Sequence, residues 1–135
     1  EFGLTDRVRI LGYLPEERLT ACFQGASAFL YPSLDEGFGL PLLQAFALGV
    51  PVLASRAGAI PETVGDAVRY VDPRDPRSIA RELVTVLADS NEAHRLAYAG
   101  YLQAKKYSWA DTARRTAEAY DHALRARGPA AGGSR

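Results

Sequence analysis

Four short, mainly apolar runs alternate with helix-forming segments in the first half of the chain, at 8–11, 28–31, 50–54 and 67–71. Each run is followed by a residue typical of turns: Gly, Pro, Ser or Asp. Runs that are apolar on successive positions predict strands buried on both faces, as in parallel sheets. The alternation therefore predicts a doubly wound, Rossmann-like α/β fold, with a parallel sheet of about four strands flanked by helices.

The helical segments carry their own start and stop signals. Pro41 lies in the first turn of a helix predicted at 40–48, and Gly49 ends it. A helix that begins after Pro15 has Cys22 on its apolar face, so we expect this cysteine in the core. Beyond residue 71, apolar stripes at helical spacing predict that the chain ends in a helical segment. The last stripe contains Trp109, Ala113, Ala117, Tyr120 and Leu124.

The chain of 135 residues is long enough for one domain with a core. We assign residues 1–127 to a partial domain and predict that the tail at 128–135, rich in Gly and Ala, is disordered. The sequence contains no methionine, so we expect it to be a piece of a longer protein.

Charge and cysteine content exclude several classes of function. Lys and Arg total 16, Asp and Glu also total 16, and this balance argues against nucleic acid as a partner. No apolar run approaches the roughly 20 residues that a membrane-spanning helix needs. The single cysteine is consistent with a reducing compartment, and we expect a cytoplasmic location. One cysteine and two isolated histidines predict no metal site.

The segment at 32–49 carries the chemistry. It follows a predicted strand and precedes a predicted helix, and ligands of open parallel sheets bind at the carboxyl ends of strands. Gly37 and Gly39 allow a ligand to approach the backbone closely. The free amides and positive dipole end of the following helix favour a phosphate. Glu36 is an acceptor for hydroxyl groups, strengthened by its charge. Together these groups suit a phosphorylated polyol such as a nucleotide sugar.

The same segment resembles the signature of retaining glycosyltransferases of family 4, which have the two-domain GT-B fold. That signature is a Glu, a Gly-Phe-Gly-Leu-Pro loop, a second Glu after seven residues, and a helix ending in Gly-x-Pro-Val. The chain has Glu36, then Gly37 to Pro41, and Gly49-Val50-Pro51-Val52. The segments 8–13, 58–62, 72–73 and 107–109 resemble further landmarks of the family in the same order. The resemblance covers about residues 6–127 and implies a partial carboxyl-terminal, donor-binding domain.

The resemblance also implies roles for individual residues. Glu36 is implied to contact hydroxyls of the donor sugar and is our candidate catalytic residue. The position eight residues after it, Gln44, is implied to hold the ribose hydroxyls. The remaining candidates are backbone positions around the sugar and diphosphate or positions that border the nucleobase. They are Gly37, Phe38, Gly39 and Leu40 for the first group, and Gly12, Tyr13 and Leu14 for the second.

Two departures from the family pattern affect the expected activity. Gln44 replaces the second Glu and brings no charge, and neutral hydrogen bonds are roughly half as strong as charge-assisted ones. The family's carboxyl-terminal domain also begins with two strand–helix units that supply a basic pair for the diphosphate. Nothing in this chain matches them, and Arg9 and Arg18 stand at the wrong places in the pattern. The amino-terminal domain that binds the acceptor is missing as well, so we expect the isolated chain to be inactive.

The missing strands have a consequence for the sheet. In the family's strand order they lie between the strand predicted at 8–11 and that at 28–31. We therefore expect either that the first strand shifts beside the second or that another copy fills the gap, which would give a homo-oligomer. The resemblance further allows peripheral membrane association of the parent protein.

Each candidate residue also has a purely structural interpretation. Glu36 could cap the helix without touching a ligand, and Gln44 could simply be solvated. Tyr13 could cover the edge of the core. Arg56 follows a strand and is interpreted as solvated, and Glu62 as the start of a short helix.

The resemblance implies a hexosyltransferase parent that moves a sugar from a UDP- or GDP-hexose to an acceptor, with retention and without an obligatory metal or cofactor. The alternative function is a non-catalytic nucleotide- or sugar-binding module, or a fragment that needs a partner domain. The departures at Gln44 and at the basic pair favour this alternative for the isolated chain.

Overall fold

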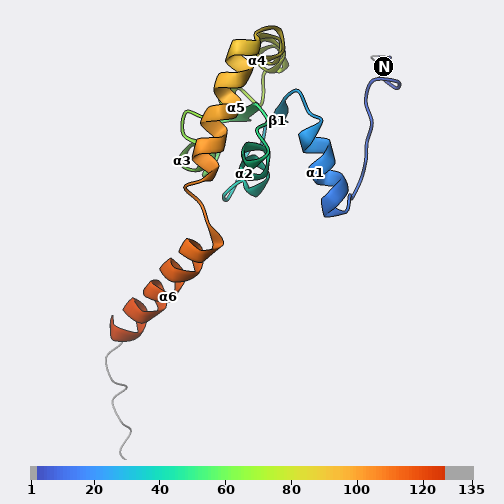
Figure 1. Ribbon diagram of the computed structural model, residues 1–135. Helices are drawn as coiled ribbons and strands as arrows, with labels where there is room; N and C mark the ends of the chain where they lie inside the picture. The colour runs from blue at the N-terminus through green and yellow to red at the C-terminus, as the bar shows by residue number, and fades with distance from the viewer. Residues whose placement is uncertain (1–2, 127–135) are drawn as a thin grey trace, which may run out of the picture.

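A computed structural model describes residues 3–126 and shows a small parallel α/β body with a projecting arm at each end (Figure 1). Its three strands are β1 (Phe29–Tyr31), β2 (Val52–Ser55) and β3 (Arg69–Val71), in the order β1-β2-β3 with every pair parallel. The predicted α/β class is confirmed, and the three strands lie within two residues of predicted runs. The predicted disordered tail at 128–135 lies outside the described residues.

The predicted strand at 8–11 is wrong, so the sheet has three strands where we expected about four. Residues 8–11 have no ladder partner, and Ile10 is 95% exposed. Within residues 3–126 no other strand lies beside this segment, and an isolated strand leaves its own N–H and C=O groups without partners. Residues 8–11 do not pair with β1 either, so the expectation that this segment shifts beside the second strand is also wrong. The segment forms an extended lead into α1 (Glu16–Gln24) instead.

Both faces of the sheet are covered by helices, because successive strand side chains point to opposite sides. Val52 and Ala54 of β2 pack on one side, together with α2 (Leu40–Ala47) and α3 (Ile60–Val64). Leu53 packs on the other side, against α4 (Pro76–Ala88) and α5 (Ser90–Ala104). Val52, Leu53 and Ala54 of β2 are buried, as the continuous apolar pattern predicted, and Ser55 is buried as well.

The helices α2 and α5 pack closely, because a glycine lies at their contact. A Cβ added to Gly100 of α5 would lie 2.3 Å from Cδ1 of Phe46, a fully buried ring of α2. Together with the burial of Leu42 and Ala45 in the same cluster, this contact holds α2 against the body. The turn that precedes α2 is therefore attached to a rigid element.

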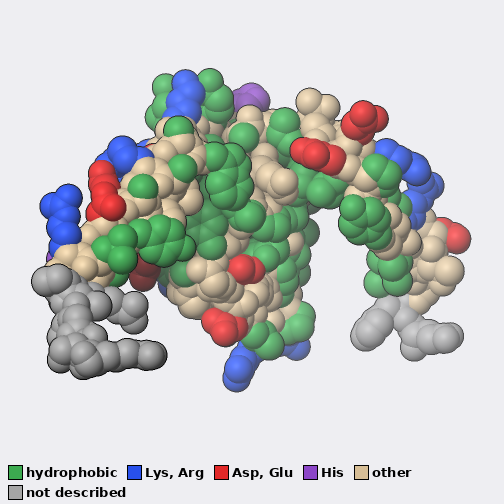
Figure 2. All heavy atoms as spheres, turned by 90° about the horizontal axis from the view of Figure 1, so that it is seen from below, with side chains coloured by type: hydrophobic (Ala, Val, Ile, Leu, Met, Phe, Trp, Pro, Cys, Tyr) green, Lys and Arg blue, Asp and Glu red, His purple; other side chains and the backbone are tan. Residues whose placement is uncertain are grey.

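The two arms are poorly packed. On α1 only Phe23 is buried, and Cys22, which we expected in the core, is exposed because the body covers only the Phe23 side of this helix. The last helix, α6 (Trp109–Ala126), has no buried residue and points away from the body (Figure 1). Figure 2 shows the hydrophobic side chains on the surface between the two arms.

Candidate functional site

The turn at 32–39 connects the carboxyl end of β1 to the start of α2 and folds around the carboxylate of Glu36. One carboxylate oxygen, Oε2, accepts a hydrogen bond from the hydroxyl of Tyr31, the last residue of β1. The other, Oε1, accepts from the backbone N–H of Gly37 at 3.1 Å and of Phe38 at 3.4 Å. The strand end and the glycine turn thus hold the carboxylate from two sides.

These hydrogen bonds favour the ionised form of Glu36. The Tyr31 hydroxyl is the largest cause that lowers the pKa of this carboxyl below its ordinary value, and the N–H of Phe38 is the next. The same contact raises the pKa of Tyr31, so its phenol remains a donor over a wide pH range. At neutral pH the site therefore contains a carboxylate that still has lone pairs free for further hydroxyl donors.

Gly39 makes the sharp entry into α2 possible. Its φ is +89°, in the left-handed region that glycine adopts readily, and it is the residue immediately before the helix. A Cβ here would also lie 2.8 Å from Cδ1 of Leu42. Pro41 follows in the first turn of α2, where a missing N–H costs nothing. The first turn of α2 therefore follows the Glu36 turn without an intervening loop.

A second loop, after β2, holds the turn from the other side. The N–H of Ala59 donates to the carbonyl oxygen of Glu36 at 2.8 Å. Gly58 allows this approach: its φ is +50°, and a Cβ there would lie 2.2 Å from that same oxygen. The resemblance placed residues 58–62 among the landmarks of the family, but it did not predict that Gly58 lies against Glu36.

The base of the turn is fixed by short side chains. Ser55 is fully buried at the end of β2, and its hydroxyl donates to the carbonyl of Ser33 at 2.5 Å. The hydroxyl of Ser33 donates to the carbonyl of Asp35 at 2.6 Å, and the Asp35 carboxylate accepts the N–H of Glu36 at 3.0 Å. The turn is thus connected to β2 through a continuous series of hydrogen bonds.

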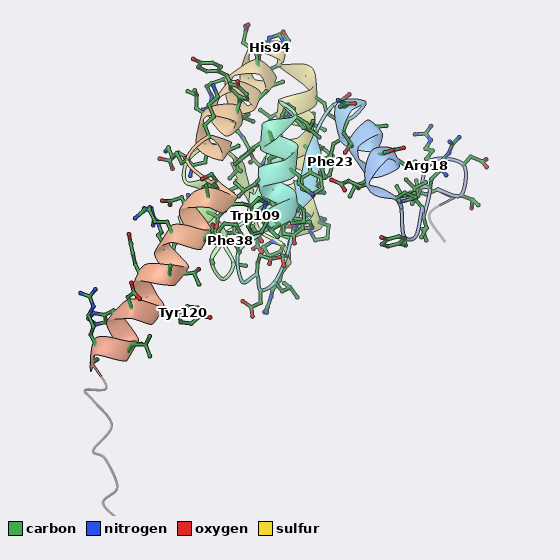
Figure 3. All side chains as sticks on the ribbon, turned by 60° about the horizontal axis from the view of Figure 1, so that its bottom comes forward. Arg18, Phe23, Phe38, His94, Trp109 and Tyr120 are labelled. Carbon is green, nitrogen blue, oxygen red and sulfur yellow. The ribbon has the colours of Figure 1, made fainter. Side chains whose placement is uncertain are left out.

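Phe38 extends from the turn toward the start of α6 (Figure 3). Its ring meets that of Tyr107 edge to face, with centroids 5.6 Å apart, and the Tyr107 hydroxyl donates to the carbonyl of Thr63 at 3.1 Å. A groove of about 480 Å³ adjoins this pair. It lies along α6 and is lined by Phe38, Lys106, Tyr107, Ser108, Asp111, Thr112, Arg115, Thr116, Ala119 and Tyr120.

The structure brings together the candidates from the second half of the motif. Gly37, Phe38, Gly39 and Leu40 surround Glu36 or follow it directly into α2, and Gln44 lies exposed one turn further along that helix.

The candidates from the first segment are not part of this cluster. Gly12, Tyr13 and Leu14 precede α1, on the arm that projects away from α2 (Figure 1). Tyr13 is 96% exposed, so it does not cover the edge of the core.

A cation–aromatic contact lies outside the cluster. Arg56 is exposed, as expected, and its guanidinium stacks on the ring of Tyr70, 3.7 Å from its centroid. Among residues 3–126, no helix has the length and apolar character to cross a membrane. In the same range, no three His, Cys, Asp or Glu side chains come together in a way that could hold a metal ion.

Sequence reasoning missed Tyr31 and Gly58 as parts of the site. Tyr31 was treated only as a strand residue. A signal was present, because a tyrosine at the end of a strand lies within reach of a carboxylate five residues later in a tight turn.

The family profile described as Glycosyl transferases group 1 matches residues 1–103. The chain is 41% identical over 113 residues to the O-antigen chain mannosyltransferase B of Escherichia coli, covering 84% of this chain and 30% of that protein. It is 36% identical to a D-inositol 3-phosphate glycosyltransferase of Corynebacterium efficiens, covering 93% of this chain and again 30% of the relative. The chain therefore spans about a third of the length of these relatives.

Solved structures give the same result for the fold. A sucrose-phosphate synthase from Thermosynechococcus elongatus superimposes with a TM-score of 0.81 at 30% identity, over 91% of this chain and 32% of that one. The C-terminal domain of a glycosyl transferase group 1 family protein from Francisella tularensis superimposes with a TM-score of 0.68 at 29% identity. That match covers 77% of this chain and 55% of the domain.

Proposed function

The chain belongs to the glycosyl transferases of group 1, and on that basis we propose that it is the donor-binding part of a retaining hexosyltransferase. The parent protein would transfer a sugar from a UDP- or GDP-hexose to an acceptor. The observation that carries the proposal is the Glu36 turn, which presents an ionised carboxylate beside the start of α2. A protein that transfers sugars needs both groups: an acceptor for sugar hydroxyls and a site for the diphosphate.

Each part of the turn has a chemical task in this proposal. Glu36 accepts hydrogen bonds from hydroxyls of the donor sugar and thereby orients the ring. The N-terminal amides of α2 face the diphosphate, which gains negative charge as the glycosidic bond breaks. Because these dipoles are fixed before the reaction, they stabilise that charge without reorganising. Retention and the absence of a required metal remain part of the proposal.

The similarity to relatives directs the choice of donor. The relatives named mannosyltransferases include one from Escherichia coli and one from Mycolicibacterium hassiacum. We therefore put GDP-mannose first among the candidate donors. UDP-glucose, GDP-glucose and the bare nucleotides complete the set.

Ligand-observed NMR on the 135-residue chain tests this function. We expect one nucleotide sugar to bind more tightly than its own nucleotide. In Glu36→Ala this sugar-dependent gain should disappear while nucleotide binding persists. Glu17→Ala, which removes an exposed carboxylate from α1, is the matched control. Equal losses for the nucleotide and its sugar conjugate in Glu36→Ala would contradict the assigned role.

The second candidate function is a binding module without catalysis. It is favoured by Gln44, which brings no charge to the position implied to hold the ribose. Binding of a nucleotide without preference for any sugar conjugate would support this second function over the first.

A further inference from the structure

The hydroxyl of Tyr31 and the carboxylate of Glu36 form the only contact of the site in which one side chain holds another, among the hydrogen bonds described for residues 3–126. The other bonds to the turn involve the backbone on at least one side. A side chain such as that of glutamate has several rotamers, and backbone amides of its own turn restrain only one oxygen. The orientation of Glu36 therefore depends on what holds the second oxygen, Oε2.

The ring of Tyr31 is itself fixed by a row of aromatic side chains. Phe29, on the same face of β1, lies 5.7 Å from it between centroids, and Phe23 of α1 meets Phe29 edge to face at 5.0 Å. Phe23 is buried, and Phe29 and Tyr31 are half-buried against the same cluster. The phenol oxygen is thus placed by the packing of the core, independently of Glu36.

We propose that Tyr31 is a positioning residue for the donor site: its hydroxyl holds Oε2 of Glu36 so that the remaining lone pairs of the carboxylate face the hydroxyls of the donor sugar. This inference rests on the proposed function, because it assigns to Tyr31 an effect on the sugar contact of Glu36. It adds a positioning residue from β1 to a site otherwise made of the turn, α2 and the loop after β2.

The groups that surround the Tyr31–Glu36 pair are consistent with this role. Tyr31 approaches from β1, Asp35 accepts the N–H of Glu36 from within the turn, and the loop after β2 contributes only backbone through Ala59. The phenol is thus the only side-chain donor described at the carboxylate within residues 3–126. Its removal leaves Oε2 to solvent and permits rotation of the side chain.

Tyr31→Phe tests the proposal, because it removes the hydroxyl and keeps the ring that packs on Phe29. Tyr70→Phe is the matched control: Tyr70 is also half-buried, lies on β3, and donates to a backbone carbonyl, that of Gly65, at 2.7 Å. Each variant is titrated with a nucleotide sugar and with its nucleotide. We expect the sugar-dependent gain in affinity to fall about tenfold in Tyr31→Phe, with nucleotide affinity unchanged, and to persist in Tyr70→Phe.

A double-mutant cycle separates positioning from a general structural effect. In a Glu36→Gln background, Tyr31→Phe should cause no further loss of sugar-dependent binding. In parallel, 13C NMR of the Glu36 carboxyl should show its pKa rising toward the ordinary value in Tyr31→Phe and staying low in Tyr70→Phe.

The outcomes distinguish the proposed function from the role of Tyr31. If the wild-type chain binds the nucleotide sugar no better than the nucleotide, both the proposed function and the role of Tyr31 are overturned. If the wild type shows the sugar preference and Tyr31→Phe retains it, or if the two substitutions add independently, only the role of Tyr31 fails.

Discussion

Glycines at single positions decide how close the two loops of the site can come. The carbonyl of Glu36 and the N–H of Ala59 are joined across a gap that only Gly58 leaves open. By contrast, Gly49 at the end of α2 also has a positive φ, +70°, but a Cβ there would meet nothing within 4 Å. Substitution at Gly49 therefore measures backbone strain alone, whereas substitution at Gly58 measures backbone strain together with a steric clash.

We predict that Gly58→Ala destabilises the chain by about 1–3 kcal/mol more than Gly49→Ala does. Both substitutions force alanine into the left-handed region, and only the first also places a Cβ against the Glu36 backbone. Urea unfolding of the two variants and the wild type measures the difference. Equal free energies of unfolding for the two variants would show that the loops separate easily.

Gln44 is an uncharged side chain where the family pattern has a glutamate. Gln44→Glu should strengthen nucleotide binding by about fivefold, because a charged acceptor gains about 1 kcal/mol over a neutral one at a ribose diol. Gln24→Glu adds the same charge on α1 and should leave affinity unchanged. The dissociation constants of UDP and GDP, measured for all three chains, give the answer. Weaker binding in Gln44→Glu would place this side chain near the phosphates instead.

At the scale of elements, one ion-pair cluster joins β3, α4 and α5. Arg69 of β3 contacts Glu82 of α4 at 2.6 Å and Glu92 of α5 at 3.0 Å, and Arg95 also contacts Glu92 at 2.7 Å. The hydrogen bond from Arg95 is the largest cause that lowers the pKa of Glu92 to about 2. Arg69 is the first residue of β3, whereas the Glu36 turn follows the last residue of β1, so we assign the cluster a structural role.

We predict that, because of this cluster, the free energy of unfolding decreases as the pH is lowered. The folded-state pKa of Glu92 lies below its ordinary value of 4.5, so the unfolded chain binds more protons between about pH 4.5 and 2. The stabilisation is therefore complete above pH 4.5 and is lost as pH falls toward 2. Urea unfolding measured from pH 6 to 2.5 gives the free energy of unfolding at each pH. This free energy should change less with pH in Glu92→Gln than in the wild type. An unchanged pH dependence would mean that the pair contributes no stability.

The sequence predicted elements with strong local signals and missed those that depend on neighbours. The strand β2 and the helix α2 follow from a continuous apolar run and from Pro41 and Gly49, which are local features. The segment 8–11 has an equally apolar pattern but no strand beside it, and a strand needs a partner. For the same reason Gly58 was missed, because its role arises only when the loop after β2 meets the Glu36 turn. The contact of Tyr31 with Glu36 is local, but it depends on a tight turn that brings the strand end and the carboxylate together.

At the scale of the molecule, the body and α6 differ in how they are stabilised. The body has a core on each face of the sheet, whereas α6 buries no residue. Its support is local: Arg114 pairs with Glu118, and Arg115 with Asp111, each at 2.6 Å along the helix. An isolated helix of this length is marginal in water even with such pairs.

We therefore predict that backbone amides of α6 exchange with deuterium far faster than those of α2 and α5, by a factor of about 100 or more. Trp109, the single tryptophan, is 77% exposed and should be quenched freely by acrylamide. Hydrogen exchange followed by mass spectrometry, together with quenching, measures both. Protection of α6 equal to that of α2 would mean that the helix is covered in solution.

The exposure of Cys22 gives the chain a built-in reporter. It is the only cysteine, it lies on α1, and Trp109 begins α6 on the opposite arm. A thiol-reactive dye attached to Cys22 would accept excitation energy from Trp109 without any substitution in the protein. The distance between the two arms, and its change when a nucleotide sugar is added, can thus be followed in the unaltered sequence.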